Sequence, residues 1–236
     1  MAKSEPFENP RAPGLDDIST RWPLIRDPVQ FVMRYAPAIQ AYLQAILKNR
    51  HDAEEVSQDF LLKGLLRGLL RTEHLHGRFR HYLKTAVRNA AIDHLQKRKP
   101  APLSDATRLP DPHDPETRAD SEWVAQWRTC LLDRTFQALD HHQRQTKGNL
   151  FHTALRLTVD HPDEDSKALA ARASASVGRA IGAAAFRQQL SRARRLFADL
   201  LVEEVRHTLQ TPTRELIEEE LAELGLLSFV RDIVVD

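Results

Sequence analysis

The chain has one cysteine, Cys130, among its 236 residues. A single thiol excludes an intrachain disulfide and a cysteine-rich zinc site. Hydrophobic runs of transmembrane length are lacking too, and the N-terminal sequence MAKSEPFENPRAPG has no apolar segment of the kind that a signal peptide needs. We therefore expect a cytoplasmic protein with no membrane partner.

Glycine is also scarce, with 8 residues in the chain, whereas leucine, alanine, arginine and glutamate dominate. So few glycines disfavour a β-rich or loop-rich fold, and the composition predicts an all-α protein. Neither sign of charge is in excess, because 34 Lys and Arg nearly balance 33 Asp and Glu and leave a net charge of +1. Total charge therefore gives no sign of a nucleic-acid partner.

Charge is nevertheless unevenly distributed along the chain. Residues 187–195 contain four arginines and no acid, whereas residues 215–223 contain five glutamates. Local fields from such segregation matter more than the sum of the charges.

Signs of an enzyme are hard to find. Eleven histidines and many carboxylates raise the alternative of a metal-dependent helical hydrolase. However, the pairs His74/His76 and His141/His142 lie in loop or helix-end positions, without an HExxH or paired ExxH spacing. We predict no catalytic residue, no metal ligand and no cofactor.

The most informative segment is 77–99, GRFRHYLKTAVRNAAIDHLQKRK. Read as one helix, it has an apolar face formed by Phe79, Leu83, Ala86 and Ala90. Basic residues recur every four positions on another face, about 6 Å apart: Arg80, Lys84 and Arg88. Such a row suits a phosphate backbone that carries unstacked bases. The alternative is a solvated amphipathic helix whose charges only keep the chain soluble.

Around this segment the sequence divides into five parts. Residues 1–20 are expected to be a flexible arm, and residues 21–99 a compact bundle of short helices. In that bundle Pro28 and Pro37 each begin a helix, Asp52 caps a third with Glu55 at the capping-box position, and Arg78 begins the fourth.

Residues 100–120 contain five prolines, five acids and no aromatic side chain, so we expect an extended acidic linker. Residues 121–210 then contain a short helix, a turn at 179–182 and a longer helix, which is the helix-turn-helix plan. Gly178 fits the position after the first helix, and Gly182 the cap of the second.

The acidic residues 211–236 are predicted to be a C-terminal helical extension. It would either regulate, by folding onto an arginine-rich face or binding a partner, or complete the core of the second domain. The side chains for that second role would be Leu216, Leu224, Leu226 and Phe229.

Three stretches, in this order, resemble the small two-domain sigma factors of bacterial RNA polymerase, the extracytoplasmic-function (ECF) type: RHDAEEVSQDFLL at 50–62, the basic segment at 77–99, and SVGRAIGAAAFRQQLSRARRLFADLLVEEV at 176–205. The segments Thr20-Arg21-Trp22 and TPTRELIEEELAELGLLSFVRD further resemble a subgroup abundant in planctomycetes. The resemblance implies a sigma-region-two-like helix bundle and a helix-turn-helix domain, joined by the acidic linker.

The resemblance also implies partners and site residues. RNA polymerase core, through its clamp and flap elements, and promoter DNA would be the partners. The linker would either occupy a basic channel of the polymerase or be an ordinary disordered tether. Either an anti-sigma factor or self-inhibition by the C-terminal extension would regulate the protein. The residues predicted to bind core polymerase are Asp52, Glu54, Glu55, Gln58 and Asp59.

Two further sets would bind DNA. The set for the −10 element is Arg78, Arg80, His81, Tyr82, Lys84, Arg88, Asn89, His94, Lys97 and Arg98. The set for the −35 element is Ala184, Arg187, Gln188, Ser191, Arg192 and Arg195. Phe79 is expected in the core, because its spacing to Leu83 is that of a buried pair.

The predicted function is that of a sigma factor that binds RNA polymerase core and directs promoter recognition, DNA melting and transcription initiation. The alternative is a stand-alone helix-turn-helix transcriptional regulator, which would need neither a clamp-binding helix nor a melting element. A decoy that occupies the polymerase without binding DNA is a further alternative, if the arginine face of the second domain is covered.

Overall fold

The computed structural model describes residues 28–67, 78–97 and 118–234. Within these ranges the chain forms helices and no strand, which confirms the all-α prediction, and Arg78 and Leu209 form an isolated antiparallel bridge. The helices are α2 (Pro28–Leu47), α3 (Arg50–Arg67), α4 (Phe79–Lys97), α5 (Arg118–Gln145), α6 (Phe151–Asp160), α7 (Ser166–Val177), α8 (Ala183–Arg206), α9 (Arg214–Glu223) and α10 (Leu227–Val234). The predicted N-terminal arm, most of the predicted linker and Arg98 lie outside the described residues.

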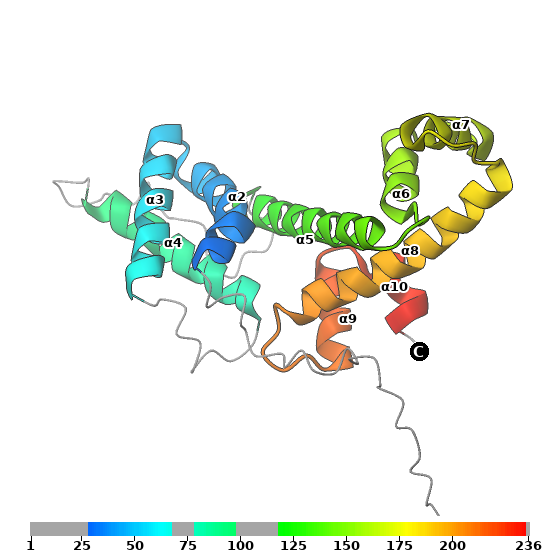
Figure 1. Cartoon of the computed structure of the whole chain (residues 1–236). Coiled ribbons are helices and arrows are strands. Elements are labelled where there is room, and N and C mark those ends of the chain that lie inside the picture. Colours follow the sequence, from blue (N-terminus) through cyan, green and yellow to red (C-terminus); the bar gives the residue numbers. More distant parts are fainter. Residues whose placement is uncertain (1–27, 68–77, 98–117, 235–236) are drawn as a thin grey trace, which may run out of the picture.

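The helices are arranged in two lobes (Figure 1). Helices α2, α3 and α4 form one lobe, and α6, α7 and the first half of α8 form the other. The long helix α5 runs between the lobes, while α9 and α10 lie beside the second half of α8. None of the helices in the described ranges combines the length and the apolar character that a membrane span requires.

An aromatic cluster joins α5 to the first lobe. Trp123 and Trp127 of α5 are fully buried, and the Trp127 ring stacks on Tyr35 of α2 at 4.8 Å between centroids. Trp123 contacts Tyr42 at 5.2 Å, and Phe79 of α4 lies 6.2 Å from Trp127. The prediction that Phe79 belongs to the core is therefore confirmed.

This core extends into the C-terminal helices. One continuous cluster of buried side chains contains residues of α2, α3, α4, α5, α8, α9 and α10. The side chains of α5 that follow the predicted linker thus pack against helices that precede it. The division into two domains remains a prediction. Helices that precede residues 100–120 and helices that follow them contribute side chains to the same core.

Two predicted helix boundaries are wrong. Pro37 does not begin a helix but lies inside α2, whose residues Ala38, Ile39 and Tyr42 are buried in the shared core. Proline in a helix interior costs about 3 kcal/mol, which this packing evidently offsets. At the start of α3, the Asn49 Oδ1 accepts hydrogen bonds from the backbone N–H of His51 at 2.9 Å and of Asp52 at 3.4 Å, so Asn49, and not Asp52, caps the helix.

The helix-turn-helix prediction agrees with the geometry of the second lobe. Gly178 ends α7 in the left-handed conformation, at φ 67°, and Gly182 is the N-cap of α8. Ser174 Oγ accepts a hydrogen bond from the N–H of Ile181 at 2.9 Å, which fixes the turn between the helices. Packing between α6, α7 and α8 uses a small core of Ala154, Leu169, Ala170, Ala173 and Phe186.

Candidate functional site

The acidic face of α3 is largely open to solvent. Glu55, Gln58 and Asp59 are exposed, and Glu54 is half-buried beside Arg50, whose Nε donates to it at 2.8 Å. Asp59 accepts from Lys63 Nζ at 3.3 Å. An exposed pair of this kind contributes little to stability, so these carboxylates are free to meet a basic partner.

Asp52 departs from the other predicted core-binding residues. It is 9 % exposed, and its Oδ1 lies 3.8 Å from Nε2 of His94 on α4. Its place in the first turn of α3 also complements the helix dipole. In the free protein this carboxylate therefore faces α4, and its role in binding core polymerase stays a prediction.

A hollow of about 360 Å³ separates α3 from the second half of α4. Glu55, Asp59 and Lys63 line it from α3. From α4, Asn89 and Lys97, both exposed, line it together with the half-buried His94. The structure thus brings predicted core-binding residues and predicted DNA-binding residues to the same groove.

The first half of α4 differs from the prediction. Arg80 was expected on an open cationic row, but it is 3 % exposed, and that prediction is wrong. The physical reason is visible in the spacing, because Arg80 precedes the buried Leu83 by three residues and the buried Val87 by seven. These are the intervals that place side chains on one helix face, so Arg80 shares the buried face.

Helix α9 supplies the partners of this buried arginine. Arg80 Nε donates to Glu220 Oε1 at 2.7 Å, and Arg80 Nη2 to Glu220 Oε2 at 3.1 Å, which makes the pair bidentate. Arg80 also donates to Glu223. Glu220 itself has no exposed surface, so this ion pair is closed to water.

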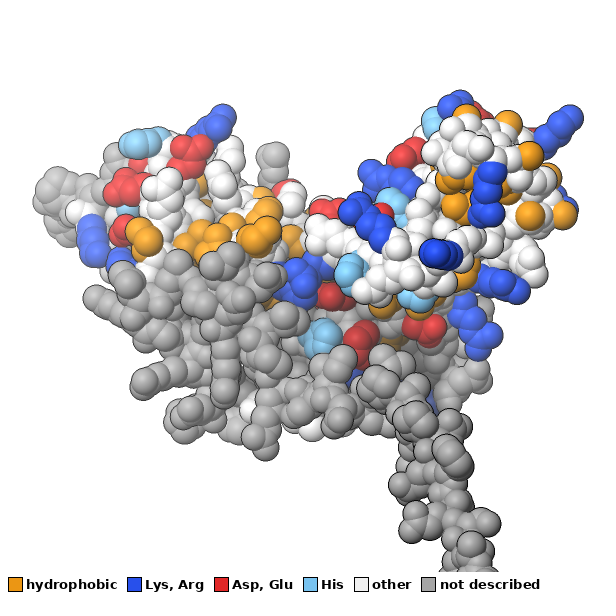
Figure 2. All heavy atoms as spheres, viewed as in Figure 1, with side chains coloured by type: hydrophobic (Ala, Val, Ile, Leu, Met, Phe, Trp, Pro, Cys, Tyr) orange, Lys and Arg blue, Asp and Glu red, His pale blue; other side chains and the backbone are white. Residues whose placement is uncertain are grey.

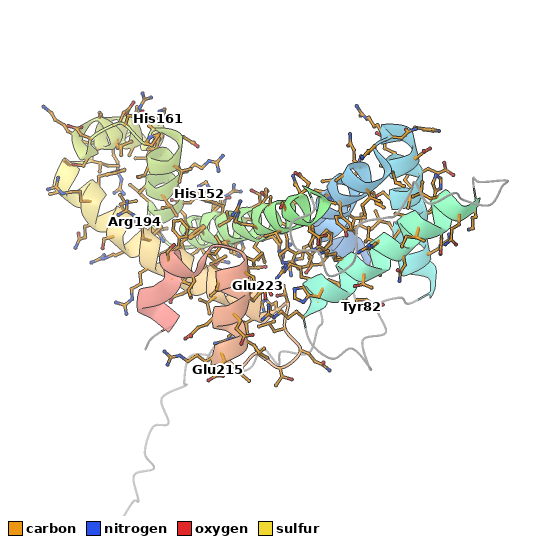
Figure 3. The ribbon with its side chains drawn as sticks, turned by 180° about the vertical axis from the view of Figure 1, so that it is seen from behind. Tyr82, His152, His161, Arg194, Glu215 and Glu223 are labelled. Atoms are coloured by element: carbon orange, nitrogen blue, oxygen red, sulfur yellow. The ribbon has the colours of Figure 1, made fainter. Side chains whose placement is uncertain are left out.

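Arg78 completes the contact at the rim. Its Nη2 donates to Glu219 Oε2 at 2.6 Å, its Nη1 lies 3.3 Å from Glu220 Oε2, and it also donates to Glu223. The Phe79 N–H donates to the Thr208 carbonyl at 3.2 Å, so the backbone joins the two segments as well. Figure 3 shows Glu223 at the end of α9 that faces the start of α4, whereas Glu215 lies at the far end.

These contacts fix the charges of the cluster. Burial alone would raise the pKa of the Glu223 carboxyl, but hydrogen bonds from Arg78 and Arg80 outweigh it and lower the pKa below its ordinary value. Burial favours the neutral imidazole of His81, and the neighbouring Arg80 lowers its pKa further. At neutral pH Glu223 therefore remains a carboxylate, and the imidazole of His81 is mostly neutral.

The next basic residue of α4 is also paired. Lys84 Nζ lies 2.7 Å from Asp120 Oδ2 at the start of α5. Burial raises the pKa of the nearby Tyr42 phenol, and the Asp120 carboxylate raises it further. Arg88 and Tyr82 are half-buried, whereas His81 is exposed, so the open part of the predicted −10 surface lies mainly in the second half of α4.

A second ion-pair group links α2 and α5 to the end of α8. Arg34 of α2 is buried and its Nη2 donates to Glu204 Oε2 of α8 at 2.8 Å. Arg134 of α5 shares that carboxylate oxygen at 3.3 Å. One carboxylate thus connects three helices, and sequence reasoning did not single out any of these residues.

The predicted −35 residues lie on the solvent side of α8. All six are exposed: Ala184, Arg187, Gln188, Ser191, Arg192 and Arg195. The buried side of the same helix holds Phe186 and Ala193, as the spacing predicts. Figure 2 shows Lys and Arg side chains over the lobe that contains α7 and α8, and acidic side chains on the lobe that contains α3.

The C-terminal extension partly matches each of its two predicted roles. Leu224 and Leu226 are buried in the shared core, and Leu216 packs against it. Phe229 is 72 % exposed, so the prediction that it belongs to this core is wrong. The acidic residues of α9 do meet arginines, but these are Arg78, just before α4, and Arg80 of α4, and not the exposed arginines of α8.

Two groups of side chains within the described ranges bring potential metal ligands within 4.8 Å of one another. In the group of His81, Glu220 and Glu223, the adjacent guanidinium groups of Arg78 and Arg80 already neutralise the carboxylates, which disfavours a cation. In the group of Asp52, Glu55 and His94, the Nε2 atom of His94 lies 3.8 Å from Asp52 Oδ1 and makes no hydrogen bond.

A comparison with protein-family models agrees with this geometry. Residues 31–100 match the model of sigma-70 region 2. The matched segment contains nearly all of α2 and the whole of α3 and α4, so the chain carries a sigma-70 region 2 domain that includes the α3–α4 groove. Searches among curated proteins and among solved structures find no match.

Proposed function

We propose that this protein is a sigma factor of the extracytoplasmic-function type, from a planctomycete-like subgroup. In this role it binds RNA polymerase core and directs promoter recognition, DNA melting and transcription initiation. The observation that supports it most is the pairing of a sigma-70 region 2 domain with a helix-turn-helix whose arginine face is exposed. Polymerase core works in the cytoplasm, which is where this role places the protein.

Core binding falls to the outer face of α3. Glu55, Gln58 and Asp59 are exposed and acidic or amidic, so they suit a basic element such as the polymerase clamp. Complementary charge sets the orientation of such a contact and speeds association. The helix-turn-helix lobe would meet the polymerase flap.

DNA binding is divided between two helices. The second half of α4 offers Asn89 to base edges and Lys97 to phosphates, and α8 offers Arg187 and Gln188 to the major groove. Regulation would come from an anti-sigma factor or from the C-terminal extension. The protein contributes no catalytic residue of its own: the polymerase supplies the chemistry, and binding energy separates the DNA strands.

Core binding discriminates this role from that of a stand-alone helix-turn-helix regulator. We expect the double variant Glu55→Gln/Asp59→Asn to bind RNA polymerase core about tenfold more weakly, a loss of about 1.4 kcal/mol. The reason is that both side chains are exposed on α3 and lose their charge without changing shape. The measurement is a fluorescence titration of the labelled protein with polymerase core from the same organism.

The matched control is Asp160→Asn/Asp163→Asn, which removes two exposed charges from the other lobe. It should bind core like the unaltered protein. Absence of any core binding by the unaltered protein would favour the stand-alone regulator. Equal losses of affinity in both double variants would contradict the claim that α3 contacts the polymerase core.

A further inference from the structure

The start of α4 is electrostatically closed by the chain's own C-terminal region. Arg78 and Arg80 bring two positive charges, and Glu219, Glu220 and Glu223 bring three negative ones, so the cluster has a net charge of about −1. Lys84 is neutralised separately by Asp120. A phosphate that approaches this end of α4 therefore meets net negative charge in place of a cationic row.

The geometry of α9 imitates what a nucleic-acid backbone would present. Three carboxylates along one face of a helix engage two guanidinium groups, one of them in a bidentate pair, and bidentate pairing is also how arginine binds phosphate. Helix α9 is fixed in this position, because Ile217, Leu221 and Leu224 of the same segment are buried in the shared core.

We propose that α9 is a built-in competitor of nucleic acid for the start of α4, which keeps this part of the region 2 domain closed until polymerase and DNA displace its outer carboxylates. This inference rests on the proposed function of α4 as a DNA-binding element. It specifies the regulation of that site: an acidic helix of the same chain occupies Arg78, which would otherwise be open to a phosphate.

The contact has a fixed part and an exchangeable part. The Arg80–Glu220 pair is sealed from water, whereas the side chains of Glu219 and Glu223 are 61 % and 45 % exposed. Phosphates can reach Arg78 by replacing the two exposed carboxylates, without opening the buried pair. Hydrogen bonding keeps the pKa of Glu223 low, so this carboxylate remains charged at neutral pH and its release needs a competing anion.

The test uses the double variant Glu219→Gln/Glu223→Gln in the full chain. It retains Glu220, so that the buried Arg80 keeps its partner, and it changes the net charge of the cluster from about −1 to about +1. We expect binding of a labelled single-stranded DNA oligonucleotide of mixed sequence to tighten at least about fivefold at low salt, measured by fluorescence anisotropy. The gain should shrink as salt is added, because electrostatic binding is screened.

The matched control is Glu215→Gln/Glu218→Gln, which removes two charges from the same helix without touching the cluster, since Glu218 pairs with Arg214 at 3.0 Å. It should bind the oligonucleotide within about twofold of the unaltered protein. Equal binding by both double variants, or weaker binding by the first, would overturn the competitor role. Circular dichroism verifies that both remain folded.

A second measurement separates this inference from the proposed function. Hydrogen exchange of the Phe79 amide, which is bonded to the Thr208 carbonyl, should stay unchanged in Glu219→Gln/Glu223→Gln when the oligonucleotide binds, because replacing the outer carboxylates leaves the buried contact closed. Tighter DNA binding without any binding of polymerase core would support the competitor and contradict the sigma-factor role. Core-dependent transcription with identical DNA binding by both double variants would contradict the competitor alone.

Discussion

Replacing Trp127 with alanine is expected to lower the free energy of unfolding by about 3–5 kcal/mol. The indole is fully buried and contacts Tyr35, Phe79 and Trp123, so its removal leaves a cavity between three helices that cannot close completely. Chemical denaturation followed by circular dichroism measures the loss. Asp133→Ala, at an exposed position of the same helix, serves as the control and should change stability by less than about 0.5 kcal/mol.

The same experiment tests the shared core. Because Trp127 follows the predicted linker and its contacts Tyr35 and Phe79 precede it, the variant should weaken the α2–α4 lobe and the C-terminal helices together, in one transition. Two separate transitions, with only the second shifted, would mean that the lobes unfold independently and that the packing across residues 100–120 contributes little.

Replacing Glu220 with alanine is the second change with a large expected effect. Both partners of the Arg80–Glu220 pair are buried, so the variant leaves a guanidinium in the interior with only Glu223 as a remaining acceptor. We expect a loss of about 3 kcal/mol in the free energy of unfolding. Thermal and chemical denaturation measure it.

The double variant Arg80→Met/Glu220→Leu should recover most of that stability, because it removes the charge together with its partner. Glu218→Ala, on the same helix and half-buried beside Arg214, provides the comparison and should cost well under 1 kcal/mol. A loss from Glu220→Ala no larger than that of Glu218→Ala would contradict the account of a sealed ion pair.

Local chemistry was the part of this molecule that its sequence predicted best. Gly178 and Gly182 set the ends of α7 and α8 by backbone geometry that depends on a few neighbouring residues, and both positions are confirmed. The burial of Phe79 followed in the same way from helical spacing. Such signals are contained within one or two helical turns, so they do not depend on the rest of the fold.

Predictions failed where distant segments meet. Arg80 lies 140 residues from Glu220, and nothing in the basic segment itself specifies which acidic helix covers it. One signal was available: Arg80 stands three and seven residues before Leu83 and Val87, which is the spacing of a buried face. An arginine on that face needs a buried acidic partner, and residues 215–223 contain five glutamates.

Pro37 illustrates the opposite case, in which packing overrides a strong local signal. Proline favours a helix start, yet α2 continues through it because Tyr35, Ala38, Ile39 and Tyr42 are all buried against neighbouring helices. A short sequence window contains the cost of the proline but not the compensation, which comes from α3, α4 and α5.

The most direct test of the central claim is transcription by reconstituted polymerase on a library of genomic fragments from the same organism. The purified protein together with polymerase core should start transcripts at a set of sites that share spaced −35 and −10 sequences and that core alone ignores. Start sites no different from those of core alone would contradict the claim that this chain selects and opens promoters.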